Sequence, residues 1–320
     1  MTRWNRILTV LLVAQLVAIV VIFWPRPAAS GGGALLPDVE AGDVSRVTIA
    51  GAEGQQITLA REGSGWVLPD ADGFPALGAQ VEELLAAVTA LDADRLVAQT
   101  ASSHDRLGVG EDEFERRIEL ETAAGESYTL YVGTSPSFGA THVRRAGEDQ
   151  VYLTSELSAQ DASPQPSAWV DAVYFQVPAD EMTELRVENE QGTFEFVKEG
   201  DTWTLADLAE GEVLDETAVG RLVSRAASVS LQRPLGREEQ PDYGLTAPTA
   251  VVTVWTADGE TRILRVGAYL PDESAYVVTS SRSPYYVTAS EFSLSDFVES
   301  GRDDWLVQPT AVPEATPEGP

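Results

Sequence analysis

The chain has 320 residues, of which 43% are hydrophobic, enough apolar side chains for the cores of about two domains. Its 51 acidic and 21 basic residues give a formal net charge of −30, which disfavours binding to nucleic acid and anionic lipid because their phosphates would be repelled. The absence of cysteine excludes structural disulfides, thiolate metal sites and cysteine nucleophiles.

The N-terminal segment predicts a membrane anchor. Residues 7–24 carry no charge, and as a helix they would reach about 27 Å, close to the roughly 30 Å hydrocarbon core of a bilayer. Arg3 and Arg6 precede this run and Trp24 closes it, which favours a cytoplasmic N-terminus and an extracytoplasmic remainder. A cleavable signal peptide is the alternative, because residues 28–30 are small and could be cut.

Changes in composition divide the rest of the chain. Three glycines follow Ser30, as in a flexible spacer, and the last residues are rich in proline and glutamate, as in a disordered tail. The predicted organisation is a cytoplasmic N-terminus and transmembrane anchor at 1–27, a Gly-rich linker at 28–42, a first unit at 43–177, a second unit at 178–308 and a tail at 309–320.

Two parts of the chain share one pattern at a spacing of about 138 residues. Each part opens with two segments that alternate apolar and polar side chains, and a tryptophan follows at the same offset, which predicts a β-meander. These segments are residues 44–49 and 57–63 with Trp66, and residues 182–187 and 194–200 with Trp203.

After each meander, apolar residues recur on one face of a 3.6-residue period, which predicts an amphipathic helix over a sheet. Asp215 or Thr217 is expected to cap the second helix. Further strands follow, and each part closes with a tryptophan, Trp169 or Trp305. The predicted fold class is α+β: two tandem copies of a β-meander/helix/antiparallel-sheet unit, preceded by one transmembrane helix. The helix-face residues are Val81, Leu84, Leu85, Val88 and Leu91, and then Val219, Leu222, Val223, Ala226 and Val229.

Three features of the second part carry a resemblance to a known family. Trp203 closes the meander, residues 243–248 read Tyr-Gly-Leu-Thr-Ala-Pro, and residues 266–267 read Val-Gly. In these features the chain resembles the bacterial domain of unknown function 4340 family, over about residues 44–307. The first part departs, because residues 106–109 read Arg-Leu-Gly-Val where Tyr-Gly-Leu is expected. The resemblance implies no activity, but it implies an association with ABC transporter components of the export type linked to gliding motility.

No catalytic, cofactor-binding or metal-binding residue is predicted. His104 and His142 lie in different segments, and neither has a second ligand at metal-binding spacing. Residues 70–73, Asp-Ala-Asp-Gly, match the start of a calcium loop but lack its closing glutamate, which favours a turn. Residues 303–304 are an acidic pair of the kind that arises by chance in such a chain.

Known catalytic motifs are missing too, since the chain has no Gly-x-Ser-x-Gly, no phosphate-binding loop and no His-Glu-x-x-His. Trp66 and Trp203 could form a ligand platform, although their matched positions favour core packing. Tyr285 and Tyr286 are expected to point to opposite faces of a strand.

Three functions are therefore considered. The first is a non-enzymatic accessory or scaffold protein with protein partners in the envelope, among them ABC transporter subunits by resemblance. The second is a binding module for an envelope glycan, peptide or cation. The third is a carboxylate-based hydrolase, for which a pair of acidic residues would be needed. The expected location is the cell membrane, crossed once, with the C-terminal domains outside the cytoplasm and no nucleic-acid partner.

Overall fold

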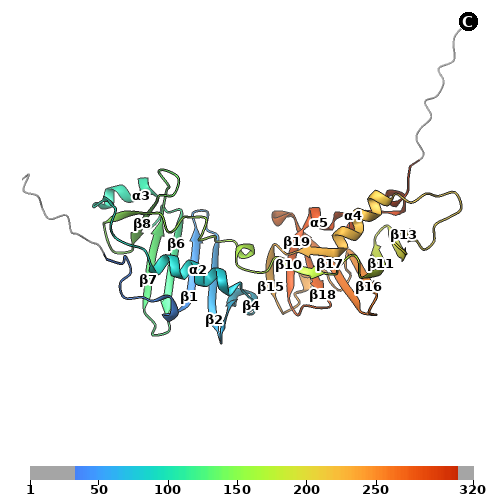
Figure 1. Ribbon diagram of the computed structural model, residues 1–320, viewed down its shortest axis with the longest axis horizontal. Helices are drawn as coiled ribbons and strands as arrows, with labels where there is room; N and C mark the ends of the chain where they lie inside the picture. The colour runs from blue at the N-terminus through green and yellow to red at the C-terminus, as the bar shows by residue number, and fades with distance from the viewer. Residues whose placement is uncertain (1–32, 309–320) are drawn as a thin grey trace, which may run out of the picture.

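Two large antiparallel sheets form the body of the protein in a computed structural model that describes residues 33–308 (Figure 1). The first sheet is built from residues 44–154 and the second from residues 182–290. Over residues 184–188 buried side chains alternate with more exposed ones, because successive residues of a strand point to opposite faces.

The first sheet has nine strands in the order β4-β3-β2-β1-β6-β7-β8-β9-β5. The meander expected from the sequence is its β1-β2-β3 part, and each neighbouring pair of strands is antiparallel. The strands are β1 (Val44–Gly51), β2 (Gln56–Glu62), β3 (Gly65–Leu68), β4 (Phe74–Pro75), β5 (Leu96–Ala98), β6 (Arg116–Thr122), β7 (Ser127–Val132), β8 (Thr141–Arg145) and β9 (Val151–Thr154).

The second sheet has eight strands in the order β13-β12-β11-β16-β17-β18-β19-β15, which is the order of the first sheet without β4. Its strands are β11 (Met182–Asn189), β12 (Gly192–Glu199), β13 (Thr202–Leu205), β15 (Arg233–Gly236), β16 (Ala250–Thr256), β17 (Thr261–Leu270), β18 (Ala275–Ser280) and β19 (Tyr286–Ser290). A separate two-stranded sheet pairs β10 (Val173–Gln176) with β14 (Ser228–Ser230).

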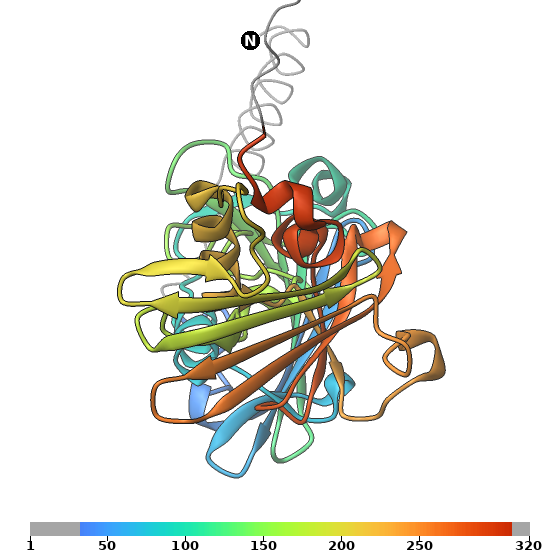
Figure 2. The ribbon, with the colours of Figure 1, turned by 90° about the vertical axis from the view of Figure 1, so that its right-hand side faces the viewer.

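Each large sheet carries one twelve-residue helix, and the second sheet carries a shorter helix as well (Figures 1 and 2). The α-helices are α2 (Gly78–Thr89), α3 (His104–Leu107), α4 (Glu216–Ala227) and α5 (Glu291–Val298). The predicted apolar faces of α2 and α4 are buried, and Asp215 caps α4 by accepting hydrogen bonds from the backbone N–H groups of Thr217 and Ala218. The predicted cap is therefore confirmed. Short 3₁₀ turns are η1 (Ala41–Asp43), η2 (Pro69–Ala71), η3 (Ala101–Ser103), η4 (Pro166–Ala168), η5 (Pro241–Tyr243), η6 (Pro271–Glu273) and η7 (Arg302–Trp305).

The predicted α+β class is wrong, because the fold is mostly β. Residues 33–308 form nineteen strands but three α-helices of eight residues or more. The stretches after α2 and α4 add the three-residue β5 and the four-residue β15 to the sheets. Such short segments show no clear apolar alternation, but pairing along a sheet satisfies their backbone N–H and C=O groups.

The predicted transmembrane helix at residues 7–24 lies outside the described residues. Within residues 33–308, the helices are all too short or too polar to cross a membrane. Leu35 and Leu36, which fall in the predicted linker, are buried in the main core, so the chain joins the first sheet's core before residue 43.

The Asp-Ala-Asp-Gly turn after β3 reaches the second sheet. Asp72 adopts a left-handed backbone conformation, with φ of 52°, and its Oδ2 accepts a hydrogen bond of 2.7 Å from the backbone N–H of Arg237. The Tyr285 hydroxyl donates to the Gly73 carbonyl at 2.8 Å, and its ring packs edge-on against Phe74 with centroids 4.7 Å apart. These five residues form the joint between the two sheets.

Candidate functional site

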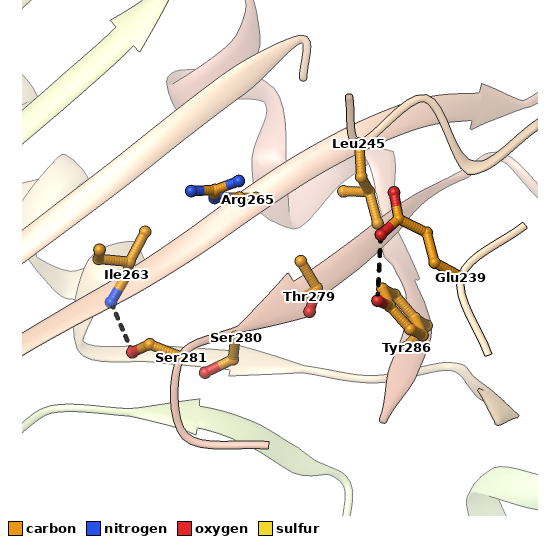
Figure 3. A pocket seen from close by; sticks show the side chains of 8 residues that line it. All are labelled: Glu239, Leu245, Ile263, Arg265, Thr279, Ser280, Ser281 and Tyr286. Atoms are coloured by element: carbon orange, nitrogen blue, oxygen red, sulfur yellow. Dashed lines mark hydrogen bonds between the residues drawn. The ribbon is translucent and has the colours of Figure 1, made fainter. Parts of the chain in front are cut away.

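The candidate site is a hollow of about 300 Å³ on the second sheet, lined by the eight residues labelled in Figure 3. Residues of the neighbouring strands β17 and β18 form its floor. Ile263 and Arg265 of β17 lie on the face opposite to the fully buried Leu264 and Val266, because side chains alternate along the strand. Arg265 lies directly across from Thr279 of β18, and this pair forms the centre of the floor.

One wall is formed by the Tyr-Gly-Leu segment, which the resemblance had singled out. Gly244 has a φ of 68°, a left-handed conformation that glycine adopts without strain, and it turns the chain so that Leu245 is buried beside the floor. A side chain on Gly267 would place its Cβ 2.1 Å from the Tyr243 carbonyl oxygen. The Val-Gly and Tyr-Gly-Leu residues are therefore in contact, because Gly267 of β17 has no side chain and lets the loop lie against the strand.

The first sheet repeats this construction with different residues. A Cβ on Gly133 would lie 2.2 Å from the Leu107 carbonyl oxygen, and Gly108 has a φ of 67°. Leu-Gly-Val thus forms the same contact as Tyr-Gly-Leu, although the first sheet lacks the expected tyrosine. The contact is made by a glycine and a backbone carbonyl of the facing segment, so it forms without a tyrosine side chain.

The corresponding place on the first sheet is filled. Tyr131 and Arg144 occupy the cross-strand positions that Arg265 and Thr279 occupy in the second sheet. Arg144 is 2% exposed, its Nε donates to the Val109 carbonyl at 2.7 Å, and its guanidinium lies 4.5 Å from the centre of the Tyr131 ring. The second sheet has the shorter Thr279 there, which leaves the space open.

Two opposite charges line the hollow. Glu239 and Arg265 are both exposed, and no N···O distance between them falls within 4.0 Å, the limit for an ion pair. The Tyr286 hydroxyl donates to Glu239 Oε2 at 3.4 Å. Partial burial, and then the negative charge of Glu239, raise the pKa of Tyr286, so its hydroxyl stays protonated and can donate at neutral pH.

The two histidines lie away from this hollow and have structural contacts. His104 hydrogen-bonds through Nε2 to the Asp149 carbonyl at 3.0 Å, and His142 through Nδ1 to the Thr134 carbonyl at 2.7 Å. Both side chains are buried. Over residues 33–308, no group of three or more histidine, aspartate or glutamate side chains is placed to hold a metal ion.

The other residues singled out from the sequence are also scattered. Trp66 is buried and donates from Nε1 to Glu82, whereas Trp203 is only partly buried. Asp304 accepts a hydrogen bond from the Gly301 backbone and caps η7. Tyr285 belongs to the joint and Tyr286 to the hollow, although only Tyr286 lies in β19 and Tyr285 immediately precedes it. Arg265 and Glu239 were missed, and no motif in the sequence marks them.

The fold and the hollow define a mostly β protein with two sheets of one strand order and an open polar site on the second. The chain belongs to the family described as Domain of unknown function (DUF4340), which matches residues 66–233. This single match runs from β3 of the first sheet to the start of β15 in the second, so two tandem copies of the family domain are not confirmed. Neither the curated proteins nor the solved structures contained a match.

Proposed function

We propose that this protein is a non-enzymatic accessory protein of a bacterial envelope assembly and that it acts by binding partner proteins. One observation carries the proposal. Phe138, in the connection between β7 and β8, has a relative exposure of 108%, so its whole ring faces solvent. Exposed aromatic side chains on loops are frequent anchors of protein–protein interfaces because they bury a large apolar area on binding.

Charge supports a partner with a basic surface. The chain carries a formal net charge of −30, and such a field attracts a positively charged partner and weakens as salt screens it. Phe138 would supply the apolar contact, and the net negative charge of the chain would supply the long-range attraction.

The joint supports a scaffolding role, because it links the two sheets through specific contacts. Asp72 bonds to the backbone of Arg237, whose guanidinium lies 4.6 Å from the centre of the Tyr285 ring. Gly236 has a φ of 110°, and a Cβ there would meet Asp72 Oδ2 at 2.5 Å. A chain built this way can present two binding surfaces at a defined separation.

The proposed location is the outer face of a cytoplasmic membrane. The uncharged run at residues 7–24, preceded by Arg3 and Arg6, supports it. Eleven residue steps separate Trp24 from the buried Leu35, and such a segment spans at most about 40 Å. The first sheet would then lie close to the membrane, where a transporter of the ABC export type, proposed from the family resemblance, could be reached.

Site-specific crosslinking in intact membranes tests this function. A photoreactive residue replaces Phe138 in one variant and Ala124 in another. Ala124 is an exposed residue in the β6–β7 turn, at the opposite end of β7, and is the matched control. We expect a defined protein adduct from position 138 alone, one that fades as salt is raised. Equal adducts from both positions, or adducts insensitive to salt, would contradict the proposal.

The hollow on the second sheet favours a second candidate, a binding module for an envelope ligand. A ligand that binds only the folded protein raises its unfolding midpoint, so a thermal shift with small envelope compounds tests this candidate. The hollow gives the hydrolase no support, because catalysis by two carboxyl groups requires a facing pair and Glu239 is the one carboxylate among the residues lining it.

A further inference from the structure

We propose that the hollow on the second sheet binds a small amphoteric group, one that carries a carboxylate and an ammonium at the two ends of a short aliphatic chain. Such groups include an ω-amino acid, whose ammonium and carboxylate are separated by methylene groups. The inference rests on the second candidate function, the ligand-binding module, and gives it a ligand class. It stands apart from partner binding through Phe138, which lies in the β7–β8 connection of the first sheet.

Arg265 is the proposed carboxylate anchor. Twelve ion pairs form within residues 33–308, and arginine supplies the cation in every one, but Arg265 takes part in none of them. Arg265 is without an ion pair there even though the chain has more than twice as many acidic as basic residues. A guanidinium presents paired N–H donors that match the two oxygens of a carboxylate, so a ligand carboxylate would satisfy this side chain.

Glu239 is the proposed ammonium anchor, and it also lacks an ion pair within residues 33–308. Tyr286 holds it by a hydrogen bond to Oε2, which leaves Oε1 free to accept from a ligand. Figure 3 shows Arg265 and Glu239 on different sides of the hollow, with Thr279 between them. Two opposite charges kept apart in one concave site are complementary to a ligand that holds its own two charges apart.

The space between the charges suits a short chain with methylene groups. Leu245 and Ile263 contribute apolar surface, and Thr279 contributes a hydroxyl. The volume of about 300 Å³ lies at the lower end of the range for ligand sites, which fits a molecule of amino-acid size.

The first sheet provides an internal comparison. There the same place is filled by Arg144, whose guanidinium stacks on Tyr131 and donates to a loop carbonyl. The equivalent place in the first sheet therefore accommodates a long cationic side chain. Replacing Arg265 by tyrosine and Thr279 by arginine would recreate that filled arrangement and close the hollow.

Three probes of matched length test the inference: 4-aminobutanoate, butanoate and butylammonium. Binding to the full chain is followed at low salt by calorimetry and by NMR. We expect 4-aminobutanoate to bind about fivefold to tenfold more tightly than either singly charged probe, because it gains one further charge-assisted contact. Arg265→Gln and Glu239→Gln should each reduce its affinity to that of the singly charged probes.

The controls separate this site from a general charge effect. Arg95→Gln removes another exposed arginine that has no ion pair within residues 33–308, and it should leave the affinity unchanged. The double variant Arg265→Tyr with Thr279→Arg should abolish binding while its unfolding midpoint shows that it is folded. If butanoate binds as tightly as 4-aminobutanoate, the hollow is an anion site and the inference fails, while the binding-module candidate survives. If none of the three probes binds, this inference fails, and a positive thermal shift with another envelope compound would still preserve the broader candidate.

Discussion

Replacing Gly267 by alanine is expected to destabilise the second sheet and distort the hollow. The new Cβ would lie 2.1 Å from the Tyr243 carbonyl oxygen and 3.0 Å from a methyl group of Leu245. The nearest obstacle is a backbone atom, which cannot rotate away as a flexible side chain could. The Tyr-Gly-Leu segment would have to move off the strand.

The magnitude follows from what that movement costs. Adding a methyl group to a packed site typically costs about 1–3 kcal/mol. Moving the segment also uncovers part of Leu245, whose full burial stabilises a protein by about 1.5–3 kcal/mol. We expect a loss of about 3 kcal/mol in the free energy of unfolding, which is about a 150-fold change in the unfolding equilibrium constant.

Urea denaturation followed by tryptophan fluorescence measures this change. Gly220→Ala is the matched control, because a Cβ at Gly220 meets nothing within 4 Å and the residue lies inside α4. Alanine is favoured over glycine in a helix interior by about 0.5–1 kcal/mol, so this variant should be slightly more stable than the wild type. If Gly267→Ala unfolds within about 0.5 kcal/mol of the wild type, the close approach inferred between loop and strand is refuted.

Three further predictions concern the joint, a helix cap and acid stability. Tyr285→Phe removes the hydrogen bond to the Gly73 carbonyl and the one accepted from Arg237, and should cost at least about 1 kcal/mol of unfolding free energy, measured by urea denaturation; an unchanged midpoint would contradict these contacts. Asp215→Ala removes the α4 cap and should also cost about 1 kcal/mol, whereas Asp215→Ser should restore most of the loss. Hydrogen bonds from Arg302 lower the pKa of Glu212 in the folded state. Its stabilising contribution is therefore complete above the unfolded-state pKa and is lost as the pH falls through the folded-state pKa. Melting temperatures measured against pH should drop less steeply in this acid range for Glu212→Gln, and identical slopes would count against the assignment.

The local elements could be predicted from the sequence because their signals are short-range. Leu84 and Leu85 of α2, and Leu222 and Val223 of α4, follow a helical period and are buried as expected. The meanders were predicted from alternation within single strands. The balance between helix and strand was not predicted, because β5 and β15 have only three and four residues and become strands through pairing with β9 and β19.

The joint and the hollow depend on long-range contacts that no local pattern encodes. The turn at residues 70–73 was expected to be a simple turn, and its aspartate instead bonds to Arg237, 165 positions later in the chain. A one-residue change in the register between β17 and β18 would separate Arg265 from Thr279 and turn side chains to the other face.

By itself the sequence determined the acidic character of the chain, its family, its two amphipathic helices and its meanders, since composition and short periodicities are properties of neighbouring residues. Only the tertiary structure decided that Glu239, Arg265 and Tyr286 share one concave surface. Their positions follow from strand order, from register and from a glycine that admits a loop carbonyl. These conditions couple residues far apart in the chain, and such coupling arises when the sheet assembles.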